Sequence, residues 1–264
     1  KPIKQTLYGS TLNHHGSTVS CFAQSRQIPA INLQHGIFGH FGHIPANADL
    51  NIVWGKSHAE FLTRYGVPRS RIKIAGPYFA RSLNPIKSSI SHHLPGSQLR
   101  ILVATQPIGA KSNRRLFQTV EAVARKNPKI SVCYKLHPDQ GKGTGYKKWI
   151  KSRTSTIIPH GKVSLQELLA WSDVVITPFS TVGYEALTLQ KPVFFFGNMR
   201  NLYYLSSRPV CFQNASQLNR IIGAMSSPLS KKRLTVRMKL KDPFGKLNTT
   251  NCIWKAIDEY RKEN

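Results

Sequence analysis

Short apolar runs alternate with amphipathic stretches along most of this chain of 264 residues. The apolar runs are strand-sized and lie at residues 29–33, 51–54, 71–75, 99–104, 130–136, 156–158, 173–177 and 192–196. The stretches with helical periodicity lie at residues 57–65, 113–126, 164–171, 181–189 and 249–262. Strands that alternate with helices are typical of parallel sheets covered on both faces. The sequence therefore predicts an α/β fold, with Ser57 as the N-cap of its helix.

The alternation breaks at residues 80–98, where prolines, a glycine and many serines leave little periodicity. Such a composition is typical of a linker. We therefore expect an α/β domain within residues 1–84, a linker at residues 85–98 and a second α/β domain at residues 99–264.

The chain is strongly basic, with 38 Lys and Arg against 11 Asp and Glu and a formal net charge of +27. Such a field favours polyanionic partners, which are nucleic acid, anionic lipid head groups or phosphorylated substrates. The basic residues are spread along the chain, with clusters at residues 142–151 and 231–241. Each cluster alone is also typical of a solvated surface. Composition does not separate the three kinds of anion.

The apolar runs and the cysteines bear on where the protein acts. No apolar run reaches the roughly 18–20 residues that a membrane-spanning helix needs. The four cysteines are far apart in the sequence and form no C-x-x-C pair. Disulfide and metal frameworks use tighter spacing, so we expect free thiols and a cytoplasmic setting.

Polar residues follow three of the predicted strands directly. They are Gln-His-Gly at 34–36, His-Pro at 137–138 and Ser-Thr at 180–181. Ligands of parallel sheets bind at the carboxyl ends of the strands, where the loops lie. These three loops are therefore the candidate site.

Each of these residue types has a chemical reason to bind a phosphorylated ligand. Ser180 and Thr181 fall at a helix N-terminus, where backbone N–H groups, two hydroxyls and the helix dipole can hold a phosphate. Glu185, one turn further on, can accept hydrogen bonds from a ribose diol. His137 can donate to a phosphate oxygen. The alternatives are an ordinary N-cap at Ser180, a first-turn acid at Glu185 and an incidental loop histidine.

The sequence predicts that no metal ion takes part. No D-x-D triplet occurs, and the few acidic residues are scattered, whereas divalent cations at phosphate sites need clustered carboxylates. Helix N-termini, His137 and basic side chains would neutralise the phosphate instead. Lys111, Arg114 and Arg115 are the preferred cations, and Lys135 is set aside because it lies inside a strand.

Several segments together resemble the donor domain of bacterial capsule and wall-polymer transferases, such as teichoic acid glycerophosphotransferases and polysialyltransferases. The segments are residues 135–138 (KLHP), 172–187 (SDVVITPFSTVGYEAL) and 191–193 (KPV). Upstream, residues 34–36 (QHG), 53–55 (VWG) and 74–77 (IAGP) are also similar. The similarity extends from about residue 30 to about residue 200.

The resemblance implies a GT-B fold, which has two Rossmann-like parallel domains and a donor cleft between them. It implies a glycosyltransferase that moves a sugar or sugar-like group to a surface-polysaccharide or lipid-linked acceptor. By its length, the first domain is expected to lack its first strands. The resemblance makes His35 the general base and needs no cofactor. It assigns donor binding to His137, Pro138, Ser180, Thr181, Glu185, Gly36, Gly55 and Gly76.

One departure from the family pattern concerns the donor. Where glycerophosphotransferases have Asp-Tyr-Ser-Ser, residues 178–181 are Pro-Phe-Ser-Thr, and the glutamate that follows resembles sugar-nucleotide transferases and 2-epimerases. The expected donor is therefore activated by CMP, CDP or UDP. The expected acceptor is an anionic or lipid-linked glycan, reached by peripheral contact with an anionic inner membrane face.

Two alternatives to a transferase remain open. A sugar-nucleotide 2-epimerase would share the fold, but it would use several carboxylates as acid and base, and acids are scarce here. A basic nucleic-acid-binding protein would carry aromatic-rich basic faces or a reader motif, and the sequence shows neither. We therefore expect no specific nucleic acid partner.

Overall fold

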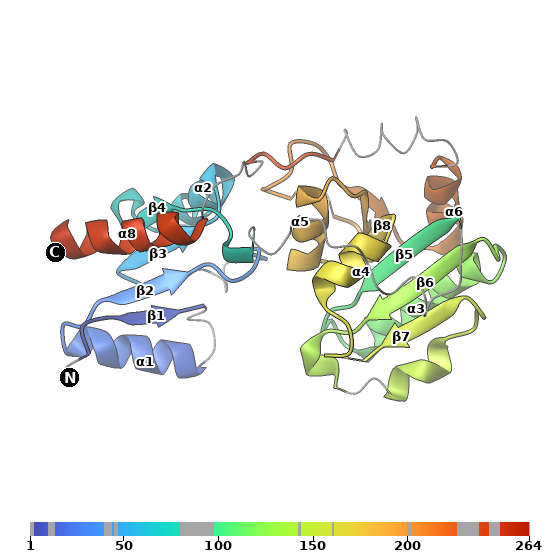
Figure 1. Ribbon diagram of the computed structural model, residues 1–264, viewed down its shortest axis with the longest axis horizontal. Helices are drawn as coiled ribbons and strands as arrows, with labels where there is room; N and C mark the ends of the chain where they lie inside the picture. Colours follow the sequence, from blue (N-terminus) through green and yellow to red (C-terminus); the bar gives the residue numbers. More distant parts are fainter. Residues whose placement is uncertain are drawn as a thin grey trace. The chain divides into compact units, whose positions relative to one another are not determined.

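The computed structural model describes residues 3–9, 14–39, 44, 47–79, 98–141, 144–159, 161–199, 202–225, 238–242 and 249–263. The chain divides into two compact units. One consists of Lys1–Asn84 with Lys241–Asn264, and the other of Pro85–Leu240. Each unit has its own parallel β-sheet with helices packed on it, which confirms the predicted α/β fold (Figure 1).

The first unit is built on a four-stranded parallel sheet in the order β1-β2-β3-β4. Its strands are β1 (Thr6–Tyr8), β2 (Ala30–Leu33), β3 (Leu50–Val53) and β4 (Ile72–Ile74). Its helices are α1 (His14–Ser25), α2 (Lys56–Arg64), the 3-10 turn η2 (Arg69–Arg71) and α8 (Thr249–Glu263). All four residues of β3 are buried, as expected for a central strand covered on both faces.

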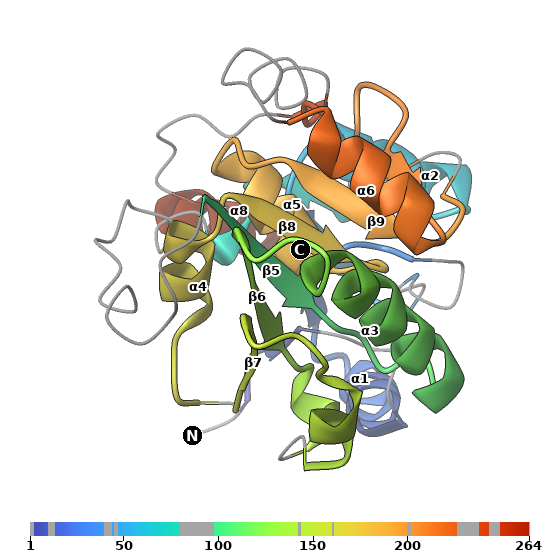
Figure 2. The same ribbon diagram turned by 90° about the vertical axis from the view of Figure 1, so that its right-hand side faces the viewer.

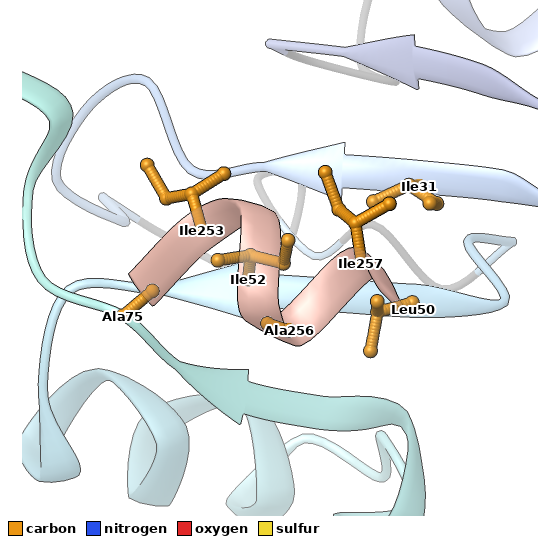
Figure 3. Close-up of a cluster of buried hydrophobic side chains, with 7 residues drawn as sticks. All are labelled: Ile31, Leu50, Ile52, Ala75, Ile253, Ala256 and Ile257. Carbon is orange, nitrogen blue, oxygen red and sulfur yellow. The ribbon is translucent and has the colours of Figure 1, made fainter. Parts of the chain in front are cut away.

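The last helix of the chain, α8, packs on the first sheet. Ile253, Ala256 and Ile257 share one helical face at i, i+3 and i+4, and they join the apolar cluster over β2 and β3 (Figure 3). The other members of this cluster are Ile31, Leu50, Ile52 and Ala75. Residues 241–264 therefore lie in the first unit, whereas the sequence analysis assigned them to the second domain.

A carboxylate from the C-terminal segment caps helix α2. The Ser57 backbone N–H and hydroxyl both donate to Asp242 Oδ2, at 2.7 and 2.5 Å. Gly55 is the N-cap residue, so the prediction of Ser57 as N-cap was wrong. A cap supplied from 185 residues away leaves no local signal in the sequence.

Gly55→Ala is expected to destabilise the first unit. A Cβ at position 55 would lie 2.6 Å from Asp242 Oδ2 and 2.7 Å from its Cβ, so the whole side chain would have to move. We expect a loss of roughly 1–3 kcal/mol in the free energy of unfolding, typical of overpacking. Chemical denaturation of Gly55→Ala, Asp242→Gly and the double variant measures it. The double variant should lose less than the sum of the singles, and strict additivity would contradict the proposed contact.

The second unit is built on a six-stranded parallel sheet in the order β10-β9-β8-β5-β6-β7. Its strands are β5 (Leu99–Ala104), β6 (Ile130–Lys135), β7 (Ser155–Ile158), β8 (Val174–Thr177), β9 (Val193–Phe196) and β10 (Val210–Phe212). Its helices are α3 (Ala110–Ala124), α4 (Leu165–Trp171), α5 (Thr181–Thr188) and α6 (Ala215–Gly223), with the 3-10 segments η5 (Pro138–Gln140) and η6 (Thr144–Trp149). Figure 2 shows α3 and α6 side by side on one face of this sheet.

The strand order of the second unit indicates at which edge of its sheet a ligand is expected to bind. The chain starts in the middle with β5, moves outward through β6 and β7, and then returns to β8 on the other side of β5. In such doubly wound sheets, ligands bind outside the carboxyl ends of the two strands where the order reverses. Here these strands are β5 and β8. The predicted linker, 85–98, lies outside the described residues except for Gln98.

Candidate functional site

The loops that follow β5, β6 and β8 meet at one edge of the six-stranded sheet, because the three strands are parallel neighbours. His137 lies just after β6, and Ser180 and Thr181 lie between β8 and α5. The structure thus places at one sheet edge the candidate donor-binding residues that the sequence analysis named in this half of the chain. They lie beside the β5–β8 reversal point.

Ser180 is the N-cap of α5. Its Oγ accepts a hydrogen bond from Val182 N–H at 3.1 Å, so the ordinary capping role weighed as an alternative is present. The Ser180 hydroxyl can still donate its hydrogen to an anionic ligand. The positive end of the α5 dipole lies at the same end of the helix and favours such a ligand. A Cβ on Gly183 would lie 3.2 Å from Thr177 Cγ2 and 3.4 Å from Val193 Cγ1. Glycine therefore lets α5 pack closely on β8 and β9, and this packing fixes the Ser180 turn.

The ring of His137 is oriented by the short turn that follows it. Its Nδ1 lies 3.3 Å from Asp139 N–H and 3.4 Å from Asp139 Oδ2, and in the tautomer in which Nδ1 accepts the backbone N–H, the ring proton is on Nε2. Pro138 occupies the first position of the turn, where its fixed φ stabilises the conformation. The side chain is about one-third exposed, so Nε2–H can donate to an external anion.

Gln140 holds the His137 loop against the loop after β5, a role that sequence reasoning missed. Its Oε1 accepts from His137 N–H at 2.8 Å and from the Thr105 hydroxyl. Its Nε2 donates to Gln106 O at 3.2 Å and to Tyr146 Oη at 3.0 Å. Both ends of one amide are therefore used to fix two strand-end loops. The only signal in the sequence was a glutamine three residues after His137.

Glu185 and Lys135 form an electrostatic pair that the sequence analysis did not anticipate. Burial raises the pKa of Glu185 from 4.5 to about 7, and the nearby Lys135 opposes this rise. Burial lowers the pKa of Lys135, and Glu185 opposes that shift. Lys135 is the last residue of β6, within the strand as expected, and its side chain is only partly buried. The preferred cations Lys111 and Arg114 instead line a groove along α3.

Glu185→Gln is expected to change the pH dependence of stability. Because the folded-state pKa of Glu185 lies above its unfolded value, the protonated form is favoured by folding. The stability that the protonated Glu185 carboxyl contributes to the folded state is complete below pH 4.5 and is lost as the pH rises through 7. The variant should therefore gain stability relative to the native chain over this window, by up to about 3 kcal/mol. Denaturation at a series of pH values measures the difference, and parallel curves would contradict the assignment.

The candidate residues of the first unit also lie at the carboxyl edge of their sheet. His35 and Gly36 follow β2, Gly55 follows β3 and Gly76 follows β4. Gly76 has a φ of +83°, which favours glycine, and Gly55 gives room to Asp242. The side chain of His35 is exposed, and its carbonyl accepts from Tyr78 Oη–H at 3.3 Å. Contact of Gly36, Gly55 and Gly76 with the donor stays a prediction.

Gln34 fixes the backbone on either side of His35. Its Nε2 donates to Gly36 O at 2.9 Å and to His58 Nδ1 at 2.7 Å. Its side-chain Oε1 accepts from Trp54 N–H at 3.1 Å, and its backbone carbonyl accepts from Trp54 Nε1–H at 2.8 Å. Burial lowers the pKa of His58 to about 3, despite Asp242, so that ring is neutral and accepts through Nδ1. The buried Gln34 amide thereby holds the backbone around His35 in a fixed conformation.

Metal-ligand clusters and membrane-spanning helices are both absent from the described part of the chain. There, no group of three or more His, Cys, Asp or Glu side chains is placed to hold a metal ion. None of the helices described is both long and apolar enough to cross a bilayer. All four cysteines are free, and Cys133 is buried in β6.

Solved structures with the same architecture identify the class of fold. The chain is similar to a UDP-N-acetylglucosamine 2-epimerase from Neisseria meningitidis bound to UDP-GlcNAc, with a TM-score of 0.66 and 12% identity, over 91% of this chain and 72% of that one. It is also similar to the wall teichoic acid polymerase TagF, with a TM-score of 0.58 and 14% identity, over 89% and 68%. A third similar structure is MnaA from Staphylococcus aureus with UDP, with a TM-score of 0.68 and 14% identity, over 92% of this chain and 70% of that one. These likenesses confirm the predicted GT-B fold.

A family model adds the chemical class. Residues 106–215 match the model of the CDP-glycerol:poly(glycerophosphate) glycerophosphotransferase family. This region contains the His137 loop, the Ser180 turn and Glu185. The match confirms the predicted resemblance and indicates that the protein is a transferase enzyme. No curated protein sequence matches the chain.

Proposed function

We propose that this protein transfers a sugar or sugar-like group from a CMP-, CDP- or UDP-activated donor to an anionic or lipid-linked glycan acceptor, without a metal ion. The observation that carries the proposal is the set of groups at the β5–β8 reversal point. There, the capped N-terminus of α5, the Nε2–H of His137 and the Glu185 carboxyl share one sheet edge. This edge lies in the region that matches the glycerophosphotransferase family.

The second unit would bind the donor. The Ser180 and Thr181 hydroxyls, the α5 dipole and His137 Nε2–H would donate to phosphate oxygens and stabilise the charge of the departing nucleotide. Glu185, when ionised, would accept hydrogen bonds from the ribose hydroxyls. Among the similar structures, the Neisseria epimerase is bound to UDP-GlcNAc and another TagF structure was soaked with CDPG, which supports a nucleotide donor.

The first unit would supply the base. His35 would take the proton of an acceptor hydroxyl while the acceptor oxygen forms a bond to the transferred group. The bond from that group to the nucleotide breaks, and the nucleotide leaves with the electron pair. We also propose that the enzyme acts in the cytoplasm at an anionic inner membrane face. The basic cluster expected to contact that face, residues 231–241, lies mostly outside the described residues.

The proposal predicts nucleotide release that depends on acceptor and persists in excess EDTA. The protein is incubated with CDP-glycerol and with UDP and CMP sugars, with and without a glycan-phosphate acceptor, and free nucleotide is measured. Release from one donor in EDTA, stimulated by acceptor, supports the proposal. Conversion of a UDP sugar to its 2-epimer without transfer would favour the epimerase alternative. Loss of transfer in EDTA with recovery in manganese would contradict metal independence.

A further inference from the structure

A basic groove runs along α3 on a face of the second unit. It lies between α3 and the segment around η6, has a volume of about 760 Å³, and extends from Ala110 to Arg125 along the helix. Five cationic side chains line it: Lys111, Arg114, Arg125, Lys148 and Lys151. From the sequence, Lys111 and Arg114 were expected at the donor phosphate, but the donor-binding groups of the proposed function include none of the five.

The cations of the groove have no acidic partners in the described part of the chain. All five are exposed, and none forms an ion pair with another described residue. The one acid in the lining, Glu121, is 2% exposed and is used internally. Its Oε1 accepts from Tyr134 Oη–H at 2.9 Å, and its Oε2 accepts from the backbone N–H groups of Lys151 and Ser152, both at 2.6 Å. The groove thus presents positive charge without a neutralising surface carboxylate.

The shape of the groove favours an extended ligand over a single small anion. Lys111, Arg114, Gln118 and Arg125 follow one stripe of α3, and from the first to the last this stripe is about 21 Å long at the helical rise per residue. Lys148 and Lys151 lie on the opposite wall. Positive groups on two walls suit a narrow chain with repeated negative charges, whereas a bilayer offers a flat surface.

The walls of the groove are held by an aromatic cluster in which Phe117 and Tyr134 are buried and Tyr146 and Trp149 are partly buried. Phe117 of α3 stacks on Tyr134 at 4.1 Å between ring centroids and meets Trp149 edge-on at 5.3 Å. Trp149 also packs against Tyr146 at 4.9 Å. The segment that carries Lys148 and Lys151 is therefore anchored to α3 before any ligand binds. Because it is already ordered, it loses little conformational entropy on binding.

We propose that the α3–η6 groove binds a linear polyanion with repeated phosphate groups, and that this polyanion is the body of the acceptor chain. One end of the groove is the N-terminus of α3, which directly follows the loop that Gln140 joins to His137. A polymer whose reacting end lies at the donor edge can continue along the groove. The identity of the polyanion as acceptor rests on the proposed function; binding of a polyphosphate does not.

The test compares two triple variants with equal charge loss. Arg114→Gln/Lys148→Gln/Lys151→Gln neutralises the groove, and Lys129→Gln/Lys162→Gln/Arg220→Gln neutralises three exposed cations outside its lining. Binding of fluorescein-labelled inorganic polyphosphate is measured by anisotropy across a salt series, with orthophosphate as a competitor. We expect the groove variant to bind about tenfold more weakly or worse, with a shallower salt dependence. The control variant should change by less than about twofold.

Several results would overturn the proposal. Equal weakening in both variants would show a general effect of net charge. If sedimentation with phosphatidylglycerol vesicles is lost in the groove variant while polyphosphate binding is unchanged, the groove is a membrane contact. Displacement of polyphosphate by equimolar orthophosphate would show a single-phosphate site. These assays use no donor and no turnover, so failure of the proposed transfer reaction leaves them interpretable.

Discussion

Replacing His35 with alanine is expected to lower the rate of transfer by about 10²–10⁴-fold, the usual contribution of a general base. The affinity for the nucleotide should stay within about twofold, because the side chains proposed to bind the phosphate and the ribose belong to the other unit. The side chain of His35 is exposed, and Gln34, not His35, makes the buried hydrogen bonds of this loop. The variant should therefore fold normally. Transfer rates at saturating donor, with calorimetric nucleotide binding, measure both effects.

Two controls distinguish a base from a residue that only shapes the loop. Tyr78→Phe removes the hydroxyl that donates to His35 O and leaves the ring in place, so it should cost much less than His35→Ala. Added imidazole should restore part of the rate of His35→Ala and none of any loss in Tyr78→Phe. Transfer close to the native rate in His35→Ala would show that another group is the base.

The second large effect is expected at the edge of the six-stranded sheet where we propose that the donor phosphate binds. His137→Ala, and the double variant Ser180→Ala/Thr181→Ala, should weaken nucleotide binding by about ten- to a hundredfold for each lost contact. Hydrogen bonds to a charged phosphate are stronger than those between neutral groups, and the backbone N–H groups at the α5 N-terminus, which both variants keep, should retain part of the affinity. Calorimetric titration with CDP and UDP gives the affinities.

Ser164→Ala is the matched control for the Ser180 turn. Ser164 caps α4 as Ser180 caps α5, and its Oγ accepts from Glu167 N–H at 3.2 Å. Losing either cap should cost about 1 kcal/mol of stability. Only the Ser180→Ala/Thr181→Ala variant should also lose nucleotide affinity. Equal affinity in both variants and the native chain would reduce the Ser180 turn to a structural cap.

Local pattern was enough to predict much of the second unit. The strand at 99–104 coincides with β5, and the predicted turns at His137 and Ser180 lie where the alternation of apolar strands and helices placed them. Parallel pairing then brings these turns to one edge without further information. The strands β1 and β10 and the helices α1 and α6 escaped notice. Both missed strands are only three residues long, with no run of buried positions to mark them.

The rest depends on contacts between residues far apart in the sequence. The amphipathic pattern of α8 predicts a helix, but nothing local indicates that it packs on the first sheet. The cap that Asp242 provides to α2 and the pairing of Lys135 with Glu185 are of the same kind. The spacing of Gln140 from His137 is a local signal for the turn, but its bond to the loop after β5 joins residues 34 positions apart and cannot be read from that spacing.

A crystal structure of the protein with bound CDP tests the central claim most directly. We predict that the phosphate groups lie at the N-terminus of α5, within hydrogen-bond distance of the Ser180 and Thr181 hydroxyls and of His137 Nε2, with Glu185 at the ribose and no metal ion between phosphate and protein. Phosphate density in the α3–η6 groove alone, or a nucleotide held by a metal ion away from α5, would contradict the account.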